Sequence, residues 1–146
     1  MANEITNKNF FTGGNAVFTV SNPAGDHYTY RISLPKTDRD GNPATDGPFF
    51  TGLLTGPDNT ASYTYMGTLN PKTLVVYPTK ASKLTPESKP WKVLAWALRV
   101  VGNGQAPPEG YAIQHEGKCC RCGRTLTTPK SIEIGIGPEC ARRSGW

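Results

Sequence analysis

All four cysteines of this chain, and one of its two histidines, lie within residues 115–140. Their spacing reads His115-x3-Cys119-x2-Cys122-x17-Cys140. This pattern supplies one imidazole and three thiolates. Zn²⁺ in closed structural sites takes four nitrogen and sulfur ligands at the corners of a tetrahedron. The sequence therefore predicts a zinc ion held by these four side chains.

The residues between these ligands suggest how the chain could surround a metal ion. Two cysteines three positions apart can face one ion, and Gly123 lets the backbone turn back beneath it, as in a zinc knuckle. Farther along, a glycine followed by Pro138 is typical of a helix start. Cys140 would then lie in the first helical turn, where the helix dipole favours a thiolate. We expect a small treble-clef-like module.

Two alternatives for the cysteines remain open. Cys120 could replace Cys119 or His115 as a ligand, but its spacing to Cys122 is tighter than knuckles use. A thiol that packs beside the site fits it better, although a different fourth ligand stays possible. Two disulfides would suit a secreted protein, whereas the adjacent cysteines and the absence of an evident signal peptide favour metal.

A site closed by four protein ligands leaves no coordination position for a reacting water molecule. Glu116 and Glu139 flank ligands but would have nothing to activate, so we expect a structural metal and no catalytic residue. No paired carboxylates, Ser/His/Asp set, phosphate loop or nucleotide fingerprint stands out elsewhere. An enzyme remains the least favoured of three functional classes.

Composition and charge limit the classes of protein to which this chain can belong. The chain has 146 residues, 36% hydrophobic content and a formal net charge of +5. No apolar run approaches the roughly 18 residues needed to span a bilayer, so no membrane partner is expected. The cysteine usage and the absence of a signal sequence favour the cytoplasm. No small-molecule substrate is evident.

The predicted zinc segment is modestly basic, and this charge favours nucleic acid, DNA or RNA, as a partner. Residues 115–146 hold six Lys/Arg and three Asp/Glu. The candidate phosphate contacts are Arg121, Arg124, Lys130, Arg142 and Arg143. Glu116, Glu133 and Glu139 lie among them and weaken the case. The alternative is a protein–protein interaction factor that docks on a host protein through this module or through an aromatic sheet face.

The preceding residues predict an α+β fold. Alternating apolar residues and turn signals indicate strands over residues 16–20, 27–34, 49–54, 61–69 and 73–77, which form a small antiparallel sheet or barrel. One buried helix is expected near 87–102, before the zinc module. We divide the chain into a β-rich domain, 1–110, and a zinc-binding module, 111–146, packed against it.

Three packing expectations follow from the aromatic residues. Residues 1–14 form a loose arm that docks by Phe10 and Phe11. The Tyr28/Tyr30 and Tyr63/Tyr65 pairs belong to the core, although exposed aromatics beside Arg31 could instead stack bases. The helix has only Lys92 and Arg99 as a polar stripe, so the zinc module, or less plausibly a partner protein, covers its outer side.

The C-terminal segment, from His115 to Arg143, resembles a small zinc-binding domain of unknown function found in many bacteriophage and bacterial mobile-element proteins. The shared pattern is Cys-x2-Cys-Gly-Arg, Leu-Thr, Pro-x-Ser and Gly-Ile-Gly-Pro-x-Cys, and this chain matches it from Cys119 to Cys140. Residues 53–59 are also similar to phage proteins of about this length. The resemblance implies zinc binding and a phage setting, hence a host-cell cytoplasm, and no established activity. A phage inhibitor of a host defence or processing complex is the form the docking alternative would take.

Overall fold

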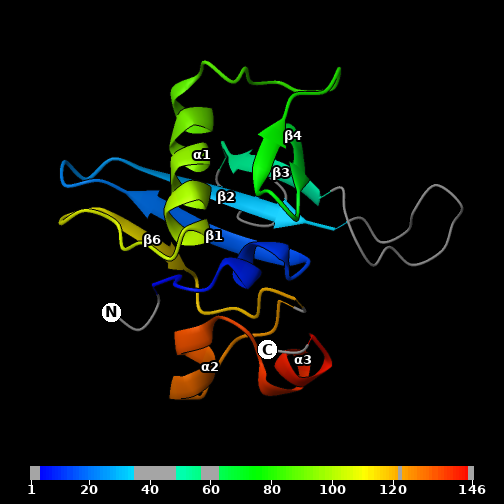
Figure 1. Cartoon of the computed structure of the whole chain (residues 1–146), viewed down its shortest axis with the longest axis vertical. Helices are drawn as coiled ribbons and strands as arrows, with labels where there is room; N and C mark the ends of the chain where they lie inside the picture. Colours follow the sequence, from blue (N-terminus) through cyan, green and yellow to red (C-terminus); the bar gives the residue numbers. More distant parts are fainter. Residues whose placement is uncertain (1–3, 35–48, 57–62, 122, 145–146) are drawn as a thin grey trace, which may run out of the picture.

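The computed structural model describes residues 4–34, 49–56, 63–121 and 123–144, except for the side chains of residues 143 and 144 (Figure 1). Cys122, one predicted ligand, and the side chain of Arg143 therefore lie outside the described part. The elements are η1 (Lys8–Thr12), β1 (Asn15–Ser21), β2 (His27–Ser33), β3 (Phe49–Leu54), β4 (Tyr63–Asn70), β5 (Val75–Tyr77), α1 (Lys89–Gly102), β6 (Ala112–His115), α2 (Pro129–Ile134) and α3 (Pro138–Ser144).

The six described strands form one antiparallel sheet in the order β5-β4-β3-β2-β1-β6. The prediction of an antiparallel sheet with a few helices is confirmed. Because β5 and β6 are the edges, the sheet is open and is not the barrel left as an alternative. The last strand in the chain, β6, pairs with β1, and Phe18 lies opposite His115.

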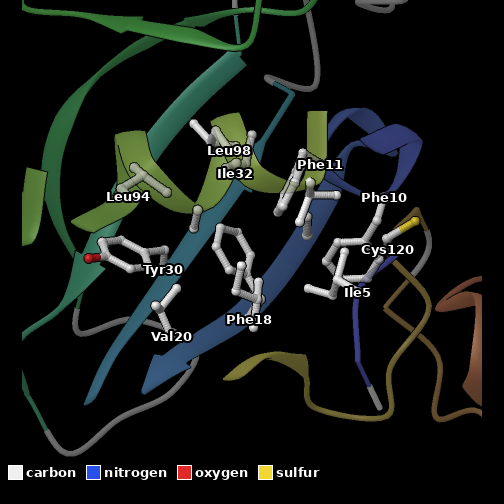
Figure 2. Packing of buried hydrophobic residues seen from close by; sticks show 14 of the residues in the cluster. Ile5, Phe10, Phe11, Phe18, Val20, Tyr30, Ile32, Leu94, Leu98 and Cys120 are labelled. Atoms are coloured by element: carbon white, nitrogen blue, oxygen red, sulfur yellow. The ribbon is translucent and has the colours of Figure 1, made fainter. Parts of the chain in front are cut away.

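The hydrophobic core lies between one face of the sheet and α1 (Figure 2). Alternate residues of β1 and β2 point to this face, and Phe18, Tyr30 and Ile32 are fully buried. Leu94 and Leu98 of α1 pack on them. Each fully buried Phe, Ile or Leu side chain of this layer contributes about 1.5–3 kcal/mol through removal from water.

The N-terminal turn η1 closes one end of this core. Its Phe10 and Phe11 side chains are 1% and 0% exposed, so the prediction that the arm docks by these rings is confirmed. The turn starts at Asn7, whose side chain accepts a hydrogen bond from the Asn9 amide. The Phe11 ring meets the Phe18 ring edge-on, with centroids 5.0 Å apart.

A register shift between β3 and β4 decides where the tyrosines of β4 point. Thr51 lies opposite Gly67 and Gly52 opposite Tyr65, so Met66 is an extra residue and is fully buried. Tyr63 and Tyr65 are thereby placed on the sheet face opposite α1. The core interpretation therefore holds for Tyr30 and fails for the tyrosines of β4, which are half-buried.

A cation–π contact lies on the sheet face opposite α1. The Arg31 guanidinium lies 4.6 Å from the centroid of the Tyr63 ring. Burial and the nearby Glu116 carboxylate raise the pKa of Tyr63, while Arg31 lowers it. The Tyr63 hydroxyl is buried and has no hydrogen-bond partner among the described residues.

The helix α1 crosses the other face, and its outer side is not covered by the C-terminal helices. Figure 1 shows α2 and α3 beyond β1 and β6, on the side of the sheet that ends in β6. The expectation that the zinc segment covers α1 is therefore wrong. The cause is β6, whose pairing with β1 carries the chain along the sheet edge and toward η1. None of the described helices has the length and apolar character needed to cross a membrane.

Two tyrosines allow a matched test of this core. The buried Tyr30 hydroxyl donates a hydrogen bond to the Pro90 carbonyl at 2.7 Å, whereas the Tyr63 hydroxyl has no partner in the described structure. We expect Tyr30→Phe to lower the free energy of unfolding by about 1 kcal/mol and Tyr63→Phe to leave it unchanged or slightly raised. Urea unfolding followed by circular dichroism measures both. An equal loss in the two variants would contradict the assignment.

Candidate metal centre

His115, the first predicted ligand, is the last residue of β6 and points into the core. Its side chain is 4% exposed, and its ring stacks on that of Phe10 with centroids 5.7 Å apart. Burial lowers the pKa of His115, and the hydrogen bond to the Ile132 carbonyl opposes that shift. The residue is therefore a neutral imidazole at physiological pH, the form that binds metal.

The hydrogen bonds of His115 define which nitrogen could coordinate a metal. Nδ1 accepts a hydrogen bond from the Gly117 amide at 2.9 Å, so the ring proton is on Nε2. Nε2 donates to the Ile132 carbonyl. Metal-binding histidines commonly donate their second nitrogen to a carbonyl in this way. Nδ1 is thus the nitrogen with a lone pair in the ring plane, and a metal there would replace the Gly117 amide.

The backbone around Cys119 forms a tight turn. The Cys119 amide donates to Arg124 O, and the Gly123 amide donates to Cys119 O, both at 2.9 Å. Gly123 has φ +77°, a left-handed conformation that favours glycine. The Arg121 amide points at Cys119 Sγ, 3.4 Å away. A donor aimed at sulfur favours the thiolate, the protonation state that a metal requires.

Cys140 lies in the first turn of α3, which begins at Pro138 as predicted. Its side chain is half-buried. Before α3 lies α2, a helix that was not predicted from the sequence. The Ser131 amide donates to the Thr128 hydroxyl, 3.3 Å away, and this bond caps the start of the helix. The signals were present: Thr-Pro is a good helix start and Gly135 a good helix stop. The short length of α2 leaves little periodicity from which to detect it.

Cys120 lies in the hydrophobic core, beside Phe10 (Figure 2). It is 0% exposed, its amide donates to Gly135 O at 3.0 Å, and its carbonyl accepts from the Asn15 amide at 2.7 Å. A Cβ added to Gly13 would come within 2.5 Å of its sulfur. This location suits the packing thiol that the spacing suggested.

The structure does not bring three described ligands into one ready-made site. Among the described residues, no three His, Cys, Asp or Glu side chains form a group that could hold a metal ion. Cys122 lies outside the described residues. The four-ligand zinc site stays a prediction, and metal sites often complete their geometry only when the metal binds.

The predicted phosphate contacts are exposed where they are described. This applies to Arg121, Arg124, Lys130 and Arg142. Glu133 and Glu139 are exposed in the same segment. The surface of this segment therefore mixes both signs of charge.

Gly135, which separates α2 from the turn before α3, is expected to be sensitive to substitution. It has φ +79°, and an added Cβ would lie 2.7 Å from the Phe10 ring. Gly135→Ala should cost at least about 2 kcal/mol, because left-handed backbone strain adds to the clash. Gly137→Ala, with nothing within 4 Å of the added Cβ, is the matched control. Equal stability of both variants in urea would contradict the contact with Phe10.

Comparison with known proteins covers this same C-terminal segment. Residues 112–145 match DUF6011, a family of unknown function. No curated protein and no solved structure matches the chain significantly. The match begins at β6, so the similar segment includes the strand that anchors His115 in the sheet as well as the cysteines.

Proposed function

We propose that this chain is a phage-type accessory protein that binds zinc through its C-terminal segment and binds nucleic acid through the basic surface of that zinc module. The observation that supports zinc most directly is the turn at Cys119. Its closing hydrogen bonds, its left-handed Gly123 and the amide aimed at Cys119 Sγ all suit a metal-bound thiolate.

The donor set fits Zn²⁺. Three thiolates and the Nδ1 atom of His115 are soft and borderline ligands of the kind that zinc takes in structural sites. The bound ion would join the turn of Cys119 to α3 through Cys140. Because the neighbouring Cys120 is already buried against Gly13, burial holds this segment against the sheet, and the metal would set its internal geometry. Its role is structural.

Nucleic acid is the partner that the charge of the module favours. Arg121 and Arg124 are exposed within the turn, and Lys130 and Arg142 are exposed on the two helices that follow. Guanidinium groups on a metal-braced turn can contact phosphates without a large loss of entropy. The exposed Glu133 and Glu139 reduce the positive electrostatic potential of this surface. We therefore expect a modest affinity for nucleic acid and a strong dependence of that affinity on salt.

One observation favours docking on a protein as the second candidate. The edge strand β5 exposes Val75 and Tyr77, at 44% and 50%, and β3 exposes Phe50 at 40%. An edge strand with exposed apolar side chains can accept a strand from another protein. Binding through such a surface would persist at high salt, whereas phosphate contacts would not.

The zinc proposal predicts different results for adjacent cysteines. Cys122→Ser and Cys140→Ser should lose zinc and unfold the C-terminal segment, because metal binding supplies its folding free energy. Cys120→Ala should keep about one equivalent of zinc, since its thiol packs in the core. Elemental analysis of the purified variants measures this. A fully folded Cys140→Ser protein without zinc would exclude a structural metal.

The nucleic-acid proposal predicts a salt-dependent loss on charge reversal. Arg121→Glu with Arg124→Glu should weaken binding about tenfold and leave zinc bound. Fluorescence anisotropy with labelled DNA and RNA, at about 50 and 200 mM salt, measures the change. Lys80→Glu with Lys83→Glu makes the same change in net charge at exposed positions outside the zinc segment and is the control. Equal losses in both pairs would remove the zinc module as the contact surface.

A further inference from the structure

The outer face of α1 carries a tryptophan within a row of cations. Lys89, Lys92, Trp96 and Arg99 are spaced at i, i+3, i+7 and i+10, which places them on one side of the helix. The three cations are exposed and Trp96 is half-buried. Within the described residues, no ion pair involves any of these cations. The row extends about 15 Å along the helix axis.

An aromatic cavity opens on one side of this row. It has a volume of about 630 Å³ and lies between α1 and the end of the hairpin formed by β1 and β2. Tyr28, Trp96 and Tyr111 line it, together with Lys89 and Lys92. Trp96 and Tyr111 have ring centroids 5.6 Å apart, and Tyr111 is 42% exposed. Aromatic surface beside cations suits a planar group attached to an anion.

Asp26 is the acidic residue among the described residues that line this cavity, and a neighbouring side chain holds it. Asp26 accepts a hydrogen bond from Asn22 Nδ2 at 3.3 Å, and Asn22 Oδ1 accepts one from the Asp26 amide at 2.9 Å. These bonds fix the turn between β1 and β2 and hold the carboxylate toward Asn22. The carboxylate keeps its charge, and Lys89 and Lys92 outnumber it on the side of α1.

A second cavity opens on the other side of α1, and the charged residues described along it are all cations. It has a volume of about 560 Å³, and Arg99, Lys72 and Lys8 line it from three different elements. No Asp or Glu is among its lining residues in the described structure. Three unneutralised cations around one hollow favour a phosphate-bearing ligand.

The charge of the surrounding sequence is consistent with these cavities. Residues 63–106, all of them described, hold six Lys/Arg and one Asp/Glu. The segment 115–146 holds six and three. The imbalance of positive over negative charge is therefore larger around α1 than in the zinc segment.

We propose that a single strand of nucleic acid lies along the outer face of α1. Its phosphates contact Lys92 and Arg99, and one of its bases stacks in the aromatic cavity on Trp96 and Tyr111. The inference rests on the proposed nucleic-acid function and adds a second contact, on a surface separate from the zinc module. A single strand is favoured over a duplex because only unpaired bases can turn their faces to aromatic side chains.

The first experiment reverses charge on the row. Zinc-loaded, full-length protein is titrated into labelled single-stranded oligo-dT, oligo-U and a hairpin duplex, with fluorescence anisotropy at several salt concentrations. Lys92→Glu with Arg99→Glu should weaken single-strand binding by about tenfold or more and lower the salt slope by about two. The control, Lys80→Glu with Lys83→Glu, makes the same change in net charge at two residues that line neither cavity. It should weaken single-strand binding by about threefold or less.

The second experiment tests stacking separately from charge. Oligo-dT should quench the fluorescence of Trp96, and Trp96→Phe should remove that quenching while the ring keeps most of the affinity. Tyr111→Ala should weaken binding by about fivefold or more at a salt concentration where the charge contribution is small. An abasic oligomer of the same length should bind the wild type more weakly than oligo-dT does. Quenching that persists in Trp96→Phe would overturn the stacking contact.

The outcomes separate this inference from the proposed function. Losses in both the α1 pair and Arg121→Glu with Arg124→Glu support the inference and the proposed function together. A loss in the α1 pair alone supports the inference and overturns the zinc module as a contact surface. The reverse result overturns the inference and keeps the proposed function. Equal losses in the α1 pair and its lysine control, tighter binding of the duplex, or equal binding of poly-glutamate would each overturn it.

Discussion

The burial of Phe10 connects the N-terminal turn, the sheet and the C-terminal segment. Its ring meets Phe11 and Phe18 at centroid distances of 6.0 and 6.4 Å, and stacks on His115 at 5.7 Å. Gly135 approaches the same ring so closely that no side chain fits there. The positions of a predicted zinc ligand and of the turn before α3 therefore both depend on this aromatic side chain from the other end of the chain. Hydrophobic burial holds the segment in place, and the metal would determine its internal geometry.

The functional proposals divide the molecule into three faces with different chemistry. The C-terminal segment has the turn and thiols suited to zinc, while its surface charge is mixed. The outer side of α1 has exposed cations and aromatic rings, and no metal ligand is expected there. The far face of the sheet has the contact between Arg31 and Tyr63. A structural zinc site and a nucleic-acid surface need not coincide, because a metal that only braces the fold can support a contact surface elsewhere.

Much of the fold could be predicted from the sequence, because apolar residues alternate in β1 and β2 and repeat every three to four residues in α1. The knuckle spacing and the start of α3 were equally visible, since they depend on neighbours in the chain. The bulge at Met66 was not, because it arises from pairing with Thr51 and Gly52. The close fit of Cys120 on Gly13, and the stacking of His115 on Phe10, join residues far apart in sequence. The location of the C-terminal segment followed from β6 pairing with β1, a choice of edge that no local pattern encodes.

The pairing of the last strand with the first has a consequence for folding during synthesis. Until residues 112–136 have left the ribosome, the edge of β1 and the pocket around Phe10 have no partner from the C-terminal segment. The nascent chain can form the hairpin of β1 and β2 and dock α1, yet it retains an unpaired edge strand and an exposed aromatic ring. Completing the sheet then requires closing a loop that includes most of the chain, a contact of high sequence separation that slows folding. The segment with the candidate metal ligands is thus also the one that completes the fold.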